Sequence, residues 1–209
     1  DNNLLERERG ITIFSKQARF KSGETEVTLL DTPGHVDFSA ETERTFCVLD
    51  YAILVISGTD GVQSHTETLW KLLSHYNIPT FIFVNKTDLD GFDKERVLSD
   101  IKSRPSTACV DFSDFGDAFF EDAAVSSEEM MEEYLSSGHV SDGALARAVG
   151  SRELFPCYFG SALKGDGVEE FIEAIDKYTI MLSYPENFGA KIYKIADDEK
   201  GKRFAFAKI

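Results

Sequence analysis

The chain has 209 residues, of which 42% are hydrophobic and 28% charged, and its formal net charge is −15. This length is enough for one sizeable α/β domain and part of a second domain. A charge of −15 has the wrong sign for a domain that grips nucleic acid through phosphates, so a basic surface for RNA is expected elsewhere in the full protein.

The sequence shows no membrane or export signal. The N-terminal stretch DNNLLERERG lacks the apolar core of a signal peptide, and apolar runs such as residues 51–57 are too short to span a bilayer. Cys47, Cys109 and Cys157 have no metal-type spacing. We therefore expect a cytoplasmic protein with free thiols, and the alternative is one disulfide with a spare thiol.

Apolar runs alternate with helical patterns along the chain. The runs YAILVIS (51–57) and TFIFV (80–84) predict strands buried on both faces. Strand–helix alternation predicts βαβ units, hence an α/β fold with a mostly parallel sheet and helices on both faces. In chain order we expect strand 27–31, a helix within 39–50, strand 51–57, helix 63–76, strand 80–84, helix 93–103, strand 155–161 and helix 169–178.

Residues 105–150 interrupt this alternation. No Lys or Arg lies between Pro105 and Ala146, whereas nine acidic residues fall between Asp111 and Glu133. Two short helices are expected, at 127–136 and 142–149. The acidic segment predicts either the solvated face of an inserted subdomain or a docking surface for a basic protein.

The last part of the chain has a different pattern. SYPENFG (183–189) indicates a linker. Two alternating runs, 191–196 and 203–209, flank the turn-forming DDEKG and predict a hairpin. We interpret residues 190–209 as the start of a second, β-structured domain that continues past Ile209.

Two stretches near the N-terminus have the chemistry of phosphate-sensing loops. In DTPGH, Asp31 at a strand end can hold a Mg²⁺ water, Gly34 can bring a backbone N–H to a phosphate oxygen, and His35 can orient an attacking water. In RGITI, the hydroxyl of Thr12 suits a Mg²⁺ ligand. Taken singly, each motif is also compatible with a plain turn or strand start.

Two further motifs follow apolar strands and suit a guanine base. In NKTD, Asp88 can accept hydrogen bonds from the N1–H and amino group of guanine, which adenine lacks. Asn85 can tether neighbouring loops, and the stem of Lys86 can lie on the base. In GSALKG, the N–H of Ala162 can donate to guanine O6, and Ser161 can support Asp88.

Together the four motifs resemble those of a translational GTPase. RGITI resembles switch I and DTPGHVDF resembles switch II, while NKTD and SAL resemble the guanine-specificity motifs, which adds Leu163 to the nucleotide-binding residues. The run LLERERGITI and the segment DGVQSHTETLWKLLSHYNIPTFIFVNKTD are similar to elongation factor G. LFPCYFGSALKGDGVEEFIEAI and AKIYKIADDEKGKRFAFAKI are most similar to the tetracycline-resistance ribosomal protection proteins.

The resemblance implies a G domain of the P-loop NTPase type, followed by a β-barrel domain. It also implies hydrolysis of Mg²⁺–GTP coupled to action on the ribosome, with His35 at the water, Thr12 and Asp31 at Mg²⁺, and a basic ribosomal protein as a possible partner of the acidic segment. In the protection branch, the whole protein would dislodge tetracycline. The alternatives are an elongation factor G paralogue that acts in translocation, or a truncated, inactive remnant that docks on the ribosome.

One departure concerns the phosphate cradle. No G-x-x-x-x-G-K-[ST] occurs in the chain, so we expect the first strand and P-loop of the family to be encoded upstream of Asp1. The expected organisation is a G domain at 1–182 without its P-loop, a linker at 183–189 and the start of the barrel at 190–209. Such a chain alone is expected to lack GTPase activity.

Overall fold

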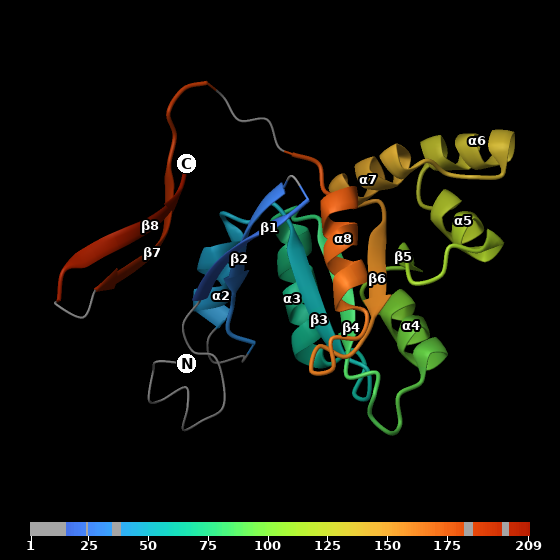
Figure 1. The fold of residues 1–209 in the computed structure, drawn as a ribbon, viewed down its shortest axis with the longest axis horizontal. Coiled ribbons are helices and arrows are strands. Elements are labelled where there is room, and N and C mark those ends of the chain that lie inside the picture. The colour runs from blue at the N-terminus through green and yellow to red at the C-terminus, as the bar shows by residue number, and fades with distance from the viewer. Residues whose placement is uncertain (1–15, 24, 35–38, 182–185, 198–200) are drawn as a thin grey trace. The chain divides into compact units, whose positions relative to one another are not determined.

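A computed structural model describes residues 16–23, 25–34, 39–181, 186–197 and 201–209 (Figure 1). The chain divides into two compact units, one of residues 1–50 and 182–209 and the other of residues 51–181. The sequence-based domain limits at 182 and 190 stay a prediction.

The second unit contains a four-stranded parallel sheet in the order β3-β4-β6-β5 (Figure 1). Its strands are β3 (Ala52–Ser57), β4 (Thr80–Asn85), β6 (Phe155–Phe159) and β5 (Cys109–Asp111). In the register, Ala52 lies opposite Thr80, and Val84 lies opposite Phe159. The predicted parallel sheet is confirmed.

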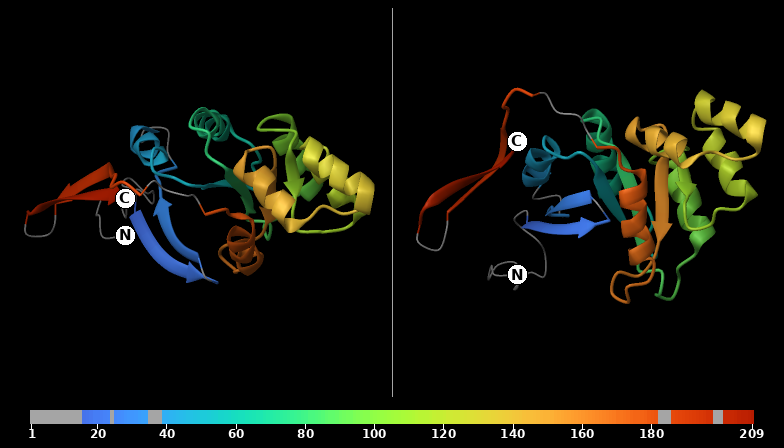
Figure 2. Two further views of the ribbon diagram at one scale, coloured as in Figure 1. Left: turned by 90° about the horizontal axis from the view of Figure 1, so that it is seen from above. Right: turned by 45° about the horizontal axis from the view of Figure 1, so that its top comes forward.

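Helices cover both faces of this sheet. The helices α3 (Ser64–His75) and α4 (Lys94–Ser103) pack on one face, and α8 (Val168–Tyr178) packs on the other, as Figure 2 shows. Successive residues of β4 point to opposite faces, so Ile82 and Val84 join one core while Phe81 and Phe83 join the other. All four are buried, as predicted for a central strand.

Strand β3 departs from the prediction. Its apolar run predicted burial on both faces, but Ile53 is 38% and Val55 is 58% exposed, while Leu54 and Ile56 are buried. Ile53 and Val55 lie in register with Phe81 and Phe83, on the face that α8 covers, but neither belongs to the core against α8. A continuous apolar run indicates a strand but does not say whether both faces are covered.

The acidic segment forms a helical subdomain over one face of the sheet. The helices α6 (Glu128–Ser137) and α7 (Asp142–Gly150) match the prediction, and each begins at a serine whose side chain caps it, Ser127 and Ser141. The short strand β5 and the helix α5 (Asp117–Ala124) were not predicted. Helix α5 begins at Gly116, which provides no side-chain cap.

Several acidic side chains of this subdomain are already paired. Lys94 lies 2.6 Å from Asp111, and Lys102 lies 2.6 Å from Asp122. Arg147 binds Glu129. The segment is therefore acidic in sequence, but part of its charge is compensated by two lysines that precede it and by Arg147 in its last helix.

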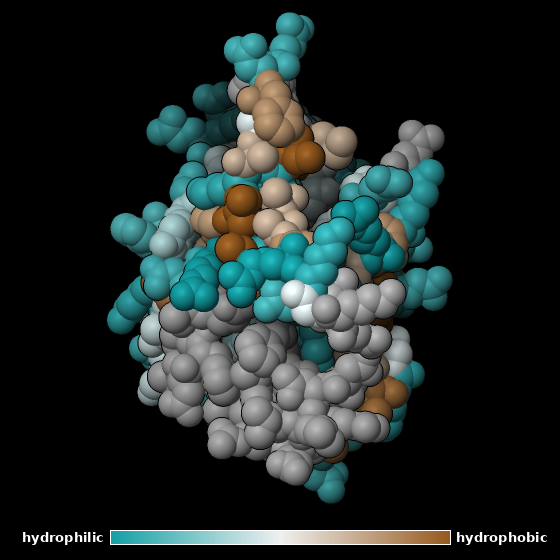
Figure 3. Space-filling model, turned by 90° about the vertical axis from the view of Figure 1, so that its left-hand side faces the viewer, coloured by the Kyte–Doolittle hydropathy of each residue, from teal (hydrophilic) through white to brown (hydrophobic). Residues whose placement is uncertain are grey.

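The described residues of the first unit form two antiparallel hairpins and a helix. Strands β1 (Lys16–Ser22) and β2 (Thr25–Asp31) pair so that Lys16 lies opposite Asp31, and α2 (Ser39–Phe46) follows. Strands β7 (Lys191–Asp197) and β8 (Arg203–Lys208) form the predicted hairpin, with a register shift between Ile192 and Lys194. The hairpin exposes Ile195, and Figure 3 shows apolar side chains gathered on this side of the molecule.

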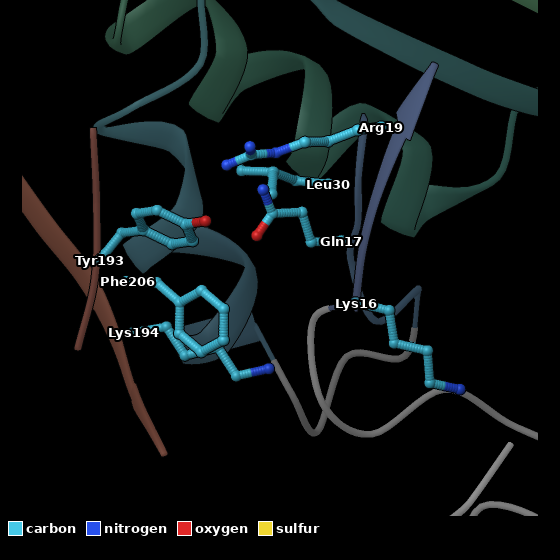
Figure 4. A pocket seen from close by; sticks show the side chains of 7 residues that line it. All are labelled: Lys16, Gln17, Arg19, Leu30, Tyr193, Lys194 and Phe206. Atoms are coloured by element: carbon cyan, nitrogen blue, oxygen red, sulfur yellow. The ribbon is translucent and has the colours of Figure 1, made fainter. Parts of the chain in front are cut away.

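A cavity of about 610 Å³ lies between the two hairpins of the first unit. In Figure 4, Gln17, Arg19 and Leu30 face Tyr193 and Phe206, and all charged side chains of the lining are basic. Burial raises the pKa of the Tyr193 hydroxyl, although the nearby charge of Arg19 acts in the opposite direction. None of the site residues predicted from the sequence lines this cavity.

Cys47, Cys109 and Cys157 are free thiols, as predicted, and the last two are fully buried. No helix in the described part of the chain is long and apolar enough to cross a membrane.

Candidate guanine-binding site

The two guanine-type motifs lie side by side at one edge of the sheet. Strands β4 and β6 are parallel neighbours, so the loops at their carboxyl ends, 85–88 and 160–163, emerge together. The N–H of Thr87 donates to the Gly160 carbonyl at 3.2 Å, and the Gly160 N–H donates to the Val84 carbonyl at 3.0 Å. The sheet register therefore joins motifs that are 72 residues apart in sequence, as Asp88 and Gly160 show.

Asn85 is the link between the loops. Its Oδ1 accepts the N–H of Lys86 at 2.8 Å and the N–H of Ala162 at 2.9 Å. The predicted tether is thus present. The same contact occupies the Ala162 N–H, which the sequence predicted to face guanine O6, so a base would have to share that donor with Asn85.

Asp88 is held as a carboxylate acceptor. The residue as a whole is exposed, and its side chain is 15% exposed. Its pKa is lowered, first by a hydrogen bond from the Ser161 hydroxyl and also by Lys164, whose Nζ lies 3.3 Å from Oδ2. Ser161 itself is 1% exposed. A carboxylate that stays ionised can accept from both guanine donors.

Lys164 is a site residue that the sequence reasoning missed. It lies within the GSALKG motif, but neither its distance in sequence from Asp88 nor its residue type indicated a contact between the two side chains. The contact depends on how the 160–167 loop folds back.

The 160–167 loop is closed on itself. The N–H of Ser161 donates to the Asp166 carbonyl at 3.0 Å, and the Asp166 N–H returns a bond to Ser161 at 3.1 Å. A Cβ at Gly160 would overlap the Asp166 carbonyl oxygen, and one at Gly167 would lie 2.5 Å from the Phe159 oxygen. Only glycine fits at these two positions.

Lys86 and Leu163 present exposed side chains at the same edge. Lys86 has a φ of 66°, which is left-handed backbone, and Leu163 is 95% exposed. Neither side chain belongs to the core clusters of the unit. Their predicted contacts with the nucleotide stay predictions.

The predicted phosphate-side residues belong to the first unit. Asp31 ends β2 with an exposed side chain, and a Cβ at Gly34 would meet nothing within 4 Å. The Pro33 carbonyl between them accepts the Thr42 hydroxyl at 2.9 Å. Thr12 and His35 lie outside the described residues. No group of three or more His, Cys, Asp and Glu side chains among the described residues could hold a metal by itself.

Comparison with known proteins decides the family. The family model for the elongation factor Tu GTP-binding domain matches residues 1–181. The chain belongs to this family. The predicted GTP-binding domain of the translation-factor type is thereby confirmed, and residues 85–88 and 160–163 lie within the matched region.

This GTP-binding domain is similar to tetracycline resistance proteins. It is 35% identical over 229 residues to TetM from transposon Tn5251 of Streptococcus pneumoniae and to TetM of Ureaplasma urealyticum. It is 33% identical over 227 residues to TetO of Streptococcus pneumoniae. Each comparison covers 100% of this chain and 36% of the relative, so the chain spans about a third of their length. The predicted resemblance to this branch is confirmed.

A solved structure has the same fold. The crystal structure of a protein from Thermus thermophilus gives a TM-score of 0.84 at 22% identity and covers 100% of this chain and 39% of that protein. This likeness supports the predicted fold class.

Proposed function

We propose that this domain binds guanine nucleotides and hydrolyses GTP within a cytoplasmic translation factor of the ribosomal protection type. The observation that carries the proposal is the arrangement around Asp88, whose ionised side chain is held by Ser161 and Lys164 where two parallel strands end. This arrangement gives a fixed acceptor for the two donors of a guanine base.

The geometry accounts for the choice of base. Asp88 would accept the N1–H and the amino group of guanine, while adenine would leave the carboxylate without partners. Unpaired polar groups in a binding site cause strong discrimination. The stem of Lys86 would lie along the base. The segment 162–163 would lie next to guanine O6, and the Ala162 N–H would donate to both O6 and Asn85 Oδ1.

The phosphate side is assigned by resemblance and by donor chemistry. The exposed carboxylate of Asp31 has the hard oxygen donors that Mg²⁺ prefers, and Thr12 would provide a second oxygen. Mg²⁺, when bound, would neutralise charge on the phosphates. Gly34 would donate its N–H to the γ-phosphate, and His35 would orient the attacking water.

The setting on the ribosome is inferred from the relatives. TetM and TetO are named as tetracycline resistance proteins, and their similarity extends over the whole of this chain. This favours the protection branch over a translocation factor. A basic ribosomal protein at the acidic subdomain remains part of the proposal, but the ion pairs of Asp111 and Asp122 reduce the charge available for it.

The direct test is nucleotide competition in the full protein that carries this domain. GDP should bind most tightly, IDP at least about tenfold more weakly because it lacks the amino group that Asp88 accepts, and ADP about 10⁴-fold more weakly. Displacement of a fluorescent GDP analogue measures all three affinities. Equal binding of GDP and ADP would refute the proposal.

A further inference from the structure

A second concave site lies on the 51–181 unit, beside the guanine loop. It is a groove of about 420 Å³ between the 112–115 segment and α8. Tyr158 and Tyr178 form part of its lining but are largely covered, at 6% and 1% exposed. Phe112 packs edge-on against Tyr178 at a centroid distance of 5.4 Å, and Phe115, 48% exposed, extends this surface to the rim.

The rim is negatively charged. Glu170 and Glu173 line the groove three residues apart on α8, and neither forms an ion pair with a residue that the structure describes. The basic residue of the lining, Lys177, lies 2.8 Å from Asp142 and 5.1 Å above the Tyr178 ring. Its charge is therefore engaged at one end of the groove, and two carboxylates remain.

The hydroxyl of Tyr158 adds an independent polar feature. The side chain is more than nine-tenths buried and lines the groove. Within the described part of the chain, the hydroxyl has no hydrogen-bond partner, unlike that of Tyr178, which bonds Asp142 at 3.3 Å. The oxygen atom itself is solvent-accessible, so it can meet a ligand in the groove.

We infer that this groove binds an arginine side chain presented by a partner protein. A guanidinium is planar, stacks on aromatic rings and offers several N–H donors in fixed directions. It would stack on the exposed ring of Phe115, donate to Glu170 and Glu173, and donate to the Tyr158 oxygen. A phosphate or carboxylate ligand would be repelled by the two glutamates.

Next to the groove, the chain already binds a cation of its own between an aromatic ring and a carboxylate. Lys94 places its ammonium 4.9 Å above the ring of Phe159 while it binds Asp111 at 2.6 Å and Ser113 at 2.8 Å. A cation thus already lies between an aromatic ring and a carboxylate next to the groove. At Glu170 and Glu173 no described cation plays this role.

Because the groove adjoins the guanine loop, an occupant should affect nucleotide binding; this expectation rests on the proposed function. Phe159 and Gly167 line the groove, and they flank the closed loop that holds Ser161. An occupant would press on both ends of this loop. We therefore expect the partner's arginine to change the affinity for GDP, because Ser161 supports Asp88.

The test uses ¹⁵N-labelled protein and N-acetyl-arginine amide as the probe. Saturable shifts of amide signals should be confined to residues 112–115, 158–159 and 167–178. N-acetyl-citrulline amide, which has the same shape without the charge, should bind at least fivefold more weakly. Glu173→Gln should weaken arginine binding at least threefold, whereas Glu169→Gln, exposed on the same helix but outside the groove, should leave it unchanged.

Two results would overturn the inference. The first is amide shifts that spread over the acidic residues of the whole 51–181 unit. The second is an equal loss of arginine binding in the Glu169→Gln and Glu173→Gln variants. Tyr158→Phe provides a second check, because it removes only the hydroxyl and should weaken the probe in a folded protein. A parallel GDP titration distinguishes the two proposals. Failure to bind GDP would count against the proposed function, whereas the arginine titration alone tests whether the groove binds a guanidinium.

Discussion

Ser161 shows how one buried residue can prepare a binding group. Its hydroxyl is the first cause of the lowered pKa of Asp88, and its backbone closes the loop through Asp166. The two roles can be separated, because a change of the side chain leaves the backbone bonds in place. Substitution of Ser161 therefore tests whether guanine binding requires the hydrogen bond from Ser161 to Asp88 in addition to the Asp88 carboxylate itself.

We expect Ser161→Ala to weaken GDP binding about three- to tenfold with little change in the fold, because one charge-assisted hydrogen bond to Asp88 is lost. The pKa of the Asp88 carboxyl should rise toward its usual value. With the serine present, guanine binding should stay constant as the pH falls to the usual aspartate range and weaken only below it; with alanine, the loss should begin at a higher pH.

Calorimetry with GDP and NMR titration of the Asp88 carboxyl provide the measurements. Ser74→Ala, an exposed change on α3, is the matched control. An unchanged GDP affinity together with an unchanged Asp88 pKa would show that Ser161 only fills space.

At the scale of elements, the important feature is the join between β4, β6 and the loop that leads into α8. The apolar runs of β4 and β6 were readable in the sequence, and so was the appearance of a polar motif after each. The order of strands was not, because it depends on which crossovers pack against the sheet. The contact of Lys164 with Asp88 was also hidden, since it arises only when the loop closes on Gly160.

Gly160→Ala should destabilise the protein by about 2–4 kcal/mol, because the new Cβ would overlap the Asp166 carbonyl oxygen and would lie 2.9 Å from the ring of Phe83. GDP affinity should fall with it, since both guanine loops use the Gly160 backbone. Urea denaturation measures the free energy of unfolding.

Gly143→Ala on α7 is the control for the loss of a glycine. There a Cβ would make an ordinary 3.5 Å contact with Arg147, so this variant should be neutral or up to about 1 kcal/mol more stable. If the Gly160 variant were as stable as wild type, the closed loop would not be a constraint on the site.

At the scale of the whole molecule, the sequence predicted the fold class, the hairpin of β7 and β8 and the family. The misses have physical causes. Helix α5 lacks a capping side chain, and three-residue β5 is too short for a periodic signal. The exposed side of β3 depends on how far the core against α8 extends over the sheet, which an apolar run does not encode. The groove beside α8 arises from elements distant in sequence.

The central claim is that Asp88 selects guanine. In the full protein, Asp88→Asn should reverse the preference from GDP to XDP, because the amide can donate to the 2-oxo group of xanthine where the carboxylate accepted from the guanine amino group. Displacement of a fluorescent nucleotide by GDP and by XDP measures the ratio of the two affinities. We predict that this ratio shifts by about 10³-fold or more toward XDP; a variant that still prefers GDP as strongly as wild type would contradict the account.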